Sequence, residues 1–138
     1  RNLEASEEVL KDGWLHTGDM ARIDCDGYVY IVGRKKEMIN VRGFNVYPRE
    51  IEEALYQDPG IKEAAVIGVA DEHKGEVPKA FVVLKENVRI SEQQILHYLR
   101  ERLAGYKVPK HIEFRSDLPK NTSGKILKRV LKDEEENK

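Results

Sequence analysis

The residues whose types and spacing could do chemistry are concentrated in segment 119–126, which reads Pro-Lys-Asn-Thr-Ser-Gly-Lys-Ile. Ser123 and Gly124 give the backbone N–H groups little steric cover, and Lys125 follows them at the expected start of a helix. Because a helix N-terminus attracts anions, a lysine at this place is suited to contact a phosphate or a carboxylate. The residues alone are equally consistent with an ordinary helix start that carries a solvated basic face.

A second candidate is Asp19, which ends the segment 13–19, Gly-Trp-Leu-His-Thr-Gly-Asp. A carboxylate directly after a glycine turn can accept hydrogen bonds from two neighbouring hydroxyl groups, as on a ribose. The alternative is a structural turn in which Trp14 and Leu15 anchor a core. Without further context the structural turn is favoured.

A third candidate is the basic segment 33–36, Gly-Arg-Lys-Lys. If this segment is extended, Arg34 and Lys36 project to one side and can clamp a phosphate or the edge of a sugar. The alternative is a solvated linker. Further along, Gly43 precedes Phe44, and a glycine in this setting suggests a bulge or the close approach of a ligand.

The composition excludes several classes of function. Among the 138 residues, 24 Lys and Arg nearly balance 25 Asp and Glu, which gives a net charge of -1. This balance argues against a general electrostatic grip on nucleic acid or anionic lipid. No apolar run approaches the roughly 20 residues needed to span a bilayer. The single cysteine, Cys25, fits a reducing compartment, and the start at Arg1 indicates a piece of a longer protein.

The elements that must position these residues follow from periodicity and turn signals. An Asp26-Gly27 pair between two apolar runs predicts a β-hairpin with a type I′ turn. Pro48 opens a helix, and Ser91 opens another with a capping box. The remaining expected elements are a short acidic helix at 3–10, strands at 38–41, 64–69, 80–84 and 112–114, and a final amphipathic helix that includes 126–131. The order predicts an α+β fold, a small mixed sheet covered by helices and preceded by a hairpin.

Taken in order, these segments resemble the acyl-adenylate-forming (AMP-binding) ligase superfamily, specifically its C-terminal domain. This superfamily includes acyl-CoA synthetases, luciferases and the adenylation domains of peptide synthetases. Segment 13–19 looks like its ribose-binding motif, 33–36 like its interdomain hinge, 41–50 like its thioester-forming loop and the following helix, and 119–126 like its catalytic-lysine motif. The resemblance covers essentially the whole chain.

The resemblance implies a division of the chain. Residues 1–33 are expected to be the tail of the large adenylate-forming domain, including a hairpin, and residues 34–37 the hinge. Residues 38–132 are expected to form the mobile C-terminal (lid) domain, and 133–138 a frayed tail. The large N-terminal domain is the implied partner. The chain alone is expected to be inactive.

The resemblance also implies a reaction and its residues. A carboxylic acid attacks the α-phosphate of ATP to give an acyl-adenylate, and the thiol of coenzyme A then displaces AMP. ATP carries Mg²⁺, held mainly by the missing domain, and no metal site is expected in this chain. The implied roles are catalysis for Lys125, ribose and nucleotide binding for Asp19 and Arg34, the hinge pivot for Lys36, and contact with the pantetheine arm of coenzyme A for Gly43 and Phe44.

Within the superfamily, the run Gly-Phe-Asn-Val-Tyr-Pro looks most like fatty acyl-CoA synthetases and coumarate–CoA ligases, so a medium- or long-chain fatty acid is expected. Asn40 stands where some relatives carry a lysine for the second step, so that role is not transferred. A cytoplasmic location is expected, with peripheral membrane association of the full-length enzyme left open. The alternatives are a noncatalytic nucleotide- or anion-binding module using residues 120–132, or a peptide-synthetase adenylation domain. RNA binding is disfavoured by the net charge.

Overall fold

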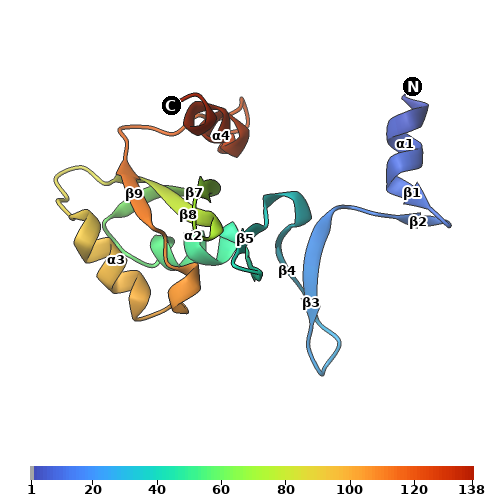
Figure 1. Ribbon diagram of the computed structural model, residues 1–138, viewed down its shortest axis with the longest axis horizontal. Coiled ribbons are helices and arrows are strands. Elements are labelled where there is room, and N and C mark those ends of the chain that lie inside the picture. Colours follow the sequence, from blue (N-terminus) through green and yellow to red (C-terminus); the bar gives the residue numbers. More distant parts are fainter. Residues whose placement is uncertain (1) are drawn as a thin grey trace. The chain divides into compact units, whose positions relative to one another are not determined.

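The structure is a computed structural model that describes residues 2–138, and the chain divides into two compact units after Lys36 (Figure 1). The boundary falls inside segment 34–37, which the sequence predicts as a hinge. A 3-10 helix, η1 (Lys35–Glu37), occupies this segment. Whether it acts as a hinge stays a prediction.

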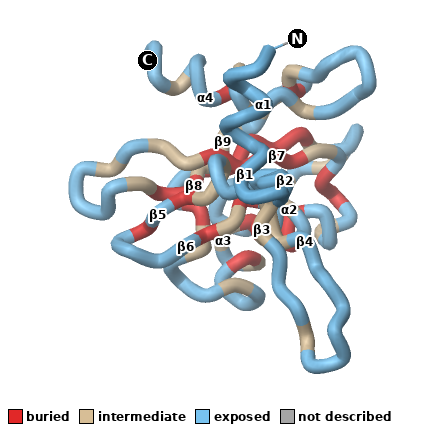
Figure 2. Tube along the Cα trace, turned by 90° about the vertical axis from the view of Figure 1, so that its right-hand side faces the viewer, coloured by how far each residue is buried: buried red, intermediate tan, exposed pale blue. Residues whose placement is uncertain are grey.

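The first unit consists of a short helix and two hairpins. Helix α1 (Leu3–Val9) leads into β1 (Leu10–Lys11) and β2 (Trp14–Leu15), and β3 (Asp19–Ile23) pairs antiparallel with β4 (Val29–Arg34). None of its described residues is buried (Figure 2). The side chains of Trp14 and Leu15 are 76% and 62% exposed, so they do not anchor a core within this chain.

The β3–β4 hairpin is confirmed, but its turn is not type I′. A type I′ turn needs a positive φ at both central residues, but of the pair Asp26-Gly27 only Gly27 has one, of 86°. The N–H of Gly27 donates to the carbonyl of Asp24 at 3.1 Å. This is the type I turn with a following left-handed glycine that closes three-residue hairpin loops. Asp24 selects it, because its carboxylate accepts from the Tyr30 hydroxyl at 2.9 Å and from the backbone N–H groups of Asp26 and Tyr28. These bonds, that of Tyr30 foremost, lower the pKa of Asp24.

The second unit contains a mixed sheet, as the sequence predicts, but with five strands where four were expected. Its strands are β5 (Ile39–Val41), β6 (Phe44–Val46), β7 (Ile61–Asp71), β8 (Gly75–Leu84) and β9 (His111–Phe114). The order β6-β5-β8-β7 is antiparallel throughout, and β9 pairs in parallel with β8. The strand β6 was not expected. Strands β7 and β8 are longer than the apolar runs that predict them, because their ends carry polar residues.

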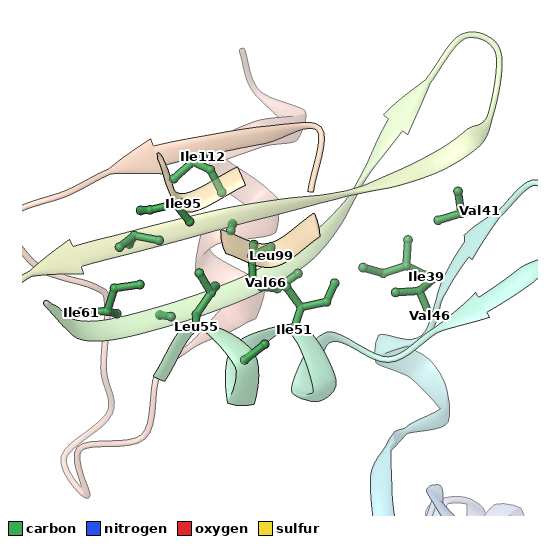
Figure 3. Close-up of a cluster of buried hydrophobic side chains, with 14 residues drawn as sticks. Ile39, Val41, Val46, Ile51, Leu55, Ile61, Val66, Ile95, Leu99 and Ile112 are labelled. Carbon is green, nitrogen blue, oxygen red and sulfur yellow. The ribbon is translucent and has the colours of Figure 1, made fainter. Parts of the chain in front are cut away.

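Helices cover both faces of this sheet. Alternate residues of β7 and β8 point to opposite faces. On one face, Val66 and Val82 join α2 (Pro48–Tyr56) and α3 (Glu92–Arg100) in the larger core, which Figure 3 shows. On the other face, Phe81 packs with Leu131 of α4 (Lys128–Glu136). The α+β prediction is therefore confirmed.

The helix boundaries show how far local signals reach. The Ser91 capping box is present, and Pro48 occupies the first turn of α2. A glycine commonly ends a helix, so the sequence predicts that the helix opened by Ser91 stops at Gly105. Helix α3 instead ends at Arg100, and Gly105 begins a 3-10 turn, η2 (Gly105–Lys107).

The structure corrects the prediction that residues 133–138 form a frayed tail. Helix α4 continues to Glu136, because carboxylates of its last turns pair with cations of the sheet. Glu135 lies 2.6 Å from the ammonium of Lys79, and Glu134 lies 2.6 Å from the guanidinium of Arg115. The polar composition that suggested fraying is therefore used for docking the helix.

Candidate active site

Lys125 lies in a closed loop and not at the start of a helix, which corrects the sequence-based expectation. Helix α4 begins three residues later, at Lys128. An isolated antiparallel bridge joins Lys120 to Ile126, and the N–H of Asn121 donates to the carbonyl of Lys125 at 2.9 Å. The argument from helix N-terminal charge therefore does not apply to Lys125, and the loop itself sets its position.

Asn121 organises the inside of this loop. Its amide oxygen accepts from the N–H of Ser123 at 3.1 Å, from the Ser123 hydroxyl at 2.8 Å and from the N–H of Lys125 at 2.8 Å. Its carbonyl accepts from the N–H of Gly124 at 3.0 Å, and Gly124 has a φ of 81°. Sequence reasoning missed this role, although the run Asn-Thr-Ser-Gly at 121–124 is a signal for an Asx turn.

The upstream end of the loop is fixed by an ion pair. The ammonium of Lys120 lies 2.7 Å from Glu63 of β7 and 3.0 Å from Asp117. The contact with Glu63, followed by that with Asp117, raises the pKa of Lys120. The ammonium of Lys120 is therefore paired with carboxylates and anchors the loop to β7.

The downstream end of the loop is fixed in the same way by Lys128. Its ammonium lies 2.7 Å from Glu52 of α2 and 3.3 Å from Glu37 of η1. Glu52 also accepts from the N–H of Val66 at 2.8 Å, so the helix start is tied to the sheet through α2.

Lys125 itself has no salt bridge with any residue of the described part of the chain, and its side chain is exposed. The loop therefore holds an uncompensated cation between two paired ones. A fixed backbone carrying a free ammonium can stabilise negative charge on a bound phosphate or carboxylate.

Gly43 forms a two-residue hairpin turn with Arg42, which rules out the bulge and leaves the close approach of a ligand as a prediction. The φ angles are 52° at Arg42 and 88° at Gly43, which define a type I′ turn between Val41 and Phe44. The N–H of Gly43 donates to the side-chain oxygen of Asn40 at 2.8 Å. A Cβ on Gly43 would meet no described atom within 4 Å, so the space above this turn is open.

Phe44 stacks on a residue that the sequence did not single out. Its ring lies 4.6 Å from that of Tyr106 in η2, with 23° between the planes. Both rings are accessible, at 55% and 39% exposure. Next to them Lys107 pairs with Glu50 at 2.7 Å. No local signal links Phe44 to Tyr106, because the contact depends on how η2 folds back onto β6.

Asp19 and Arg34 lie opposite each other at the ends of β3 and β4. Nε of Arg34 is 2.7 Å from Oδ1 of Asp19, and the N–H of Asp19 donates to the Thr17 hydroxyl at 3.1 Å. Within the described chain, Oδ2 of Asp19 has no hydrogen-bond donor. The carboxylate is thus oriented by an arginine and keeps an oxygen free to accept.

The predicted site residues therefore fall into three groups. Asp19 and Arg34 are brought together in the first unit. Lys36 is exposed in η1 at the boundary. Lys125 and Gly43 belong to the second unit, on separate loops.

Metal and membrane features can be described for residues 2–138 only. Among them, no group of three or more His, Cys, Asp or Glu side chains could hold a metal ion. None of the helices in that range is long and apolar enough to cross a membrane.

The fold and these motifs agree with one family. The chain belongs to the family of AMP-binding enzyme C-terminal domains, which it matches over residues 50–125, more than half of its length. It is 51% identical over 131 residues to a long-chain-fatty-acid–CoA ligase of Escherichia coli O6:H1, covering 95% of the chain and 23% of the ligase. It is 54% identical over 125 residues to a feruloyl-CoA synthase of an Amycolatopsis species, covering 91% and 26%.

A solved structure extends this likeness to three dimensions. The crystal structure of an anthranilate CoA ligase in complex with anthranoyl-AMP matches with a TM-score of 0.89 and 40% sequence identity. The match covers 98% of this chain and 27% of the ligase chain. The chain thus spans about a quarter of the length of the curated relatives it matches.

Proposed function

We propose that this chain is the C-terminal part of an AMP-forming acyl-CoA ligase, an acid–thiol ligase that uses ATP and coenzyme A. In the first step a carboxylate oxygen attacks the α-phosphorus of ATP, and pyrophosphate leaves. In the second step the sulfur of coenzyme A attacks the acyl carbon, its thiol proton is lost, and AMP leaves. The observation that carries the proposal is the free ammonium of Lys125 on an ordered loop of an AMP-binding C-terminal domain.

Lys125 is proposed to act in the first step. Negative charge accumulates on the oxygens of the attacking carboxylate and of the α-phosphate, and an ammonium placed between them lowers the barrier. Its cation is available for this, because no carboxylate of the described chain neutralises it. By contrast, Lys120 and Lys128 are paired with Glu63 and Glu52.

Asp19 and Arg34 are proposed to bind the nucleotide. An arginine that holds one oxygen of Asp19 leaves the other free for the ribose hydroxyls. The guanidinium of Arg34 is 48% exposed and can contact the nucleotide from the same place.

Gly43 is proposed to face the pantetheine arm of coenzyme A in the second step, with Phe44 beside it. The open space above the turn supports this, since a side chain at Gly43 would project into that space.

The two steps are proposed to use different orientations of the lid domain, residues 38–132, about a hinge at 34–37 with Lys36 as pivot. The division of the chain after Lys36 supports this segment as the place of movement. Alternation of two sites on one moving domain is a common form of gating.

The partner is proposed to be a large N-terminal domain to which the first unit belongs. This unit exposes large apolar side chains, including Leu3, Trp14, Leu15, Tyr28 and Ile31, and none of its residues 2–36 is buried. Large apolar patches exposed in this way mark surfaces that pack against another domain or protein. That domain is proposed to hold the acyl group and the Mg²⁺ that accompanies ATP, since the described residues offer no metal-binding group.

The acyl substrate is proposed to be a long-chain fatty acid, in keeping with the ligase that is 51% identical. A hydroxycinnamate is the competing substrate, since a feruloyl-CoA synthase is 54% identical. ATP–pyrophosphate exchange in the full-length protein with each acid distinguishes them. We also propose a cytoplasmic location for the enzyme. Cell fractionation and imaging of the full-length protein can test this location.

The test of the function is Lys125→Ala in the full-length protein. Carboxylate-dependent ATP–pyrophosphate exchange should fall roughly 10²–10³-fold, by analogy with loss of a transition-state charge donor. Thioester formation from supplied acyl-adenylate should persist. Lys132→Ala, which changes another exposed lysine of the second unit, is the matched control and should leave both steps intact. Unchanged exchange in Lys125→Ala would overturn the proposal and favour a noncatalytic binding module.

A further inference from the structure

The Lys125 loop has fixed ends and a single internal organiser. Lys120 ties one end to Glu63, and Lys128 ties the other to Glu52. These anchors hold the ends of the loop, but neither contacts the backbone of Lys125. Asn121 fixes that backbone from both sides: its side-chain oxygen accepts from the Lys125 N–H at 2.8 Å, and its own N–H donates to the Lys125 carbonyl at 2.9 Å.

Few other contacts restrain the loop between its anchors. Thr122, Ser123, Gly124 and Lys125 are all exposed, so packing does not hold them. Gly124, at a φ of 81°, is a residue type that reaches several conformations at little cost. The hydrogen bonds within the loop therefore decide which conformation it adopts.

Asn121 takes part in each hydrogen bond within segment 121–125, while the bond from the Leu127 N–H to the Pro119 carbonyl at 2.7 Å closes the base of the loop. The side-chain oxygen of Asn121 accepts from Ser123 and Lys125, its carbonyl accepts from Gly124, and its N–H donates to the carbonyl of Lys125. Truncating the side chain removes the three bonds to its oxygen and leaves the two backbone bonds. The N–H groups of Ser123 and Lys125 would then turn to water, and the backbone of Lys125 would be held through its carbonyl alone, with more freedom to move.

We propose that Asn121 is a positioning residue for the adenylation step: it holds the backbone of Lys125 so that the ammonium reaches the reacting oxygens. This inference rests on the proposed function of Lys125. Asn121 does not touch the substrate in this account and acts only through Lys125. A displacement of about 1 Å of a catalytic group can cost on the order of 10²-fold in rate.

The kinetic test uses Asn121→Ala in the full-length protein. The kcat of ATP–pyrophosphate exchange should fall roughly 10–100-fold, with the KM for ATP and the thioester step nearly unchanged. In the Lys125→Ala background, Asn121→Ala should cause no further loss, because a residue that acts only through Lys125 has nothing left to position. Thr122→Ala, a change to an exposed neighbour in the same loop, is the control and should leave kcat unaltered.

A second measurement does not depend on activity. Hydrogen exchange of a peptide covering residues 121–126 should speed up in Asn121→Ala and stay unchanged in Thr122→Ala, since only the former removes the acceptor of the Lys125 N–H. Unchanged exchange protection in Asn121→Ala would contradict the inference.

The possible outcomes distinguish the positioning role of Asn121 from the proposed function of Lys125. If Lys125→Ala abolishes pyrophosphate exchange while Asn121→Ala keeps wild-type kcat, the positioning role is wrong and the proposed function stands. If Asn121→Ala lowers both half-reactions together, or adds its full effect to that of Lys125→Ala, Asn121 supports folding in general and the inference is again wrong. If Lys125→Ala keeps wild-type pyrophosphate exchange, the positioning role of Asn121 and the proposed function are both wrong.

Discussion

Nε of Arg34 lies 2.7 Å from Oδ1 of Asp19, across the paired ends of β3 and β4. Both side chains keep substantial exposure, at 48% for Arg34 and 29% for Asp19. Exposed pairs of this kind add little to stability, typically about 0–1 kcal/mol. The pair is therefore better explained as an oriented acceptor than as a structural link.

Asp19→Asn should weaken nucleotide binding without unfolding the protein. The neutral amide keeps the size of the side chain but loses the charge that strengthens hydrogen bonds to hydroxyl groups, so the KM for ATP should rise about 10-fold or more. Steady-state exchange kinetics and a thermal melt measure the two effects. Asp26→Asn, in the turn of the same hairpin, is the control. A wild-type KM in Asp19→Asn would remove Asp19 from the nucleotide site.

Gly43→Ala should damage the second half-reaction selectively. The φ of 88° at Gly43 is strained for a residue with a side chain, at a cost of about 1–2 kcal/mol. The added methyl group also enters the open space proposed for the pantetheine arm. Thioester formation from acyl-adenylate should slow, while pyrophosphate exchange should persist.

Gly105→Ala is the matched control for this prediction. Gly105 has no positive φ, and a Cβ there would likewise meet no described atom within 4 Å. Equal thioester rates in Gly43→Ala and in the wild-type enzyme would place coenzyme A elsewhere.

Lys128→Ala should affect stability more than Lys125→Ala does. It removes the partner of Glu52, a carboxylate whose side chain is only 14% exposed, so unfolding should become easier by about 1.5–3 kcal/mol. Lys125 has no partner to lose among the described residues, and its removal should change the free energy of unfolding by no more than about 0.5 kcal/mol. Urea titration of both variants measures the difference, and equal stabilities would contradict this division of roles.

Stability should fall in acid through the ion network around Glu113. Burial tends to raise its pKa, but hydrogen bonds from Lys79, Arg115 and Lys138 outweigh this and lower the pKa from 4.5 to about 2. Because the pKa is lower in the folded state, the stabilisation is complete above about pH 4.5 and is lost as the pH falls toward 2.

Glu113→Gln should therefore flatten the dependence of the free energy of unfolding on pH between those values. Urea unfolding at a series of pH values measures the slope. Glu86→Gln, which changes an exposed glutamate in the turn after β8, should leave the slope as in the wild type. The same steepness in Glu113→Gln would assign the acid sensitivity to other carboxylates.

Much of the fold could be predicted from the sequence where signals act within one turn or one hairpin. Pro48 and Ser91 place the starts of α2 and α3, because a fixed φ or a capping side chain acts on the next few residues only. The continuous apolar runs at 64–67 in β7 and 80–84 in β8 likewise indicate a sheet that is covered on both faces.

Predictions failed where one local pattern has more than one solution. Asp26-Gly27 permits a type I′ turn, but the carboxylate of Asp24 stabilises a longer loop. The apolar spacing from Ile126 onward predicts a helix, but hydrogen bonds from Lys125 to Asn121 and from Leu127 to Pro119 hold the chain in a loop until Lys128.

The sequence by itself determined which residue types can do chemistry: a carboxylate at Asp19, a glycine turn at Gly43 and a lysine at Lys125. Only the tertiary structure decided which lysines are available. Lys120 and Lys128 are neutralised by carboxylates from β7 and α2, whereas no carboxylate among residues 2–138 pairs with Lys125. Such pairings, like the stack of Phe44 on Tyr106, join segments far apart in the chain. They depend on how the elements pack, and local sequence patterns carry no information on that packing.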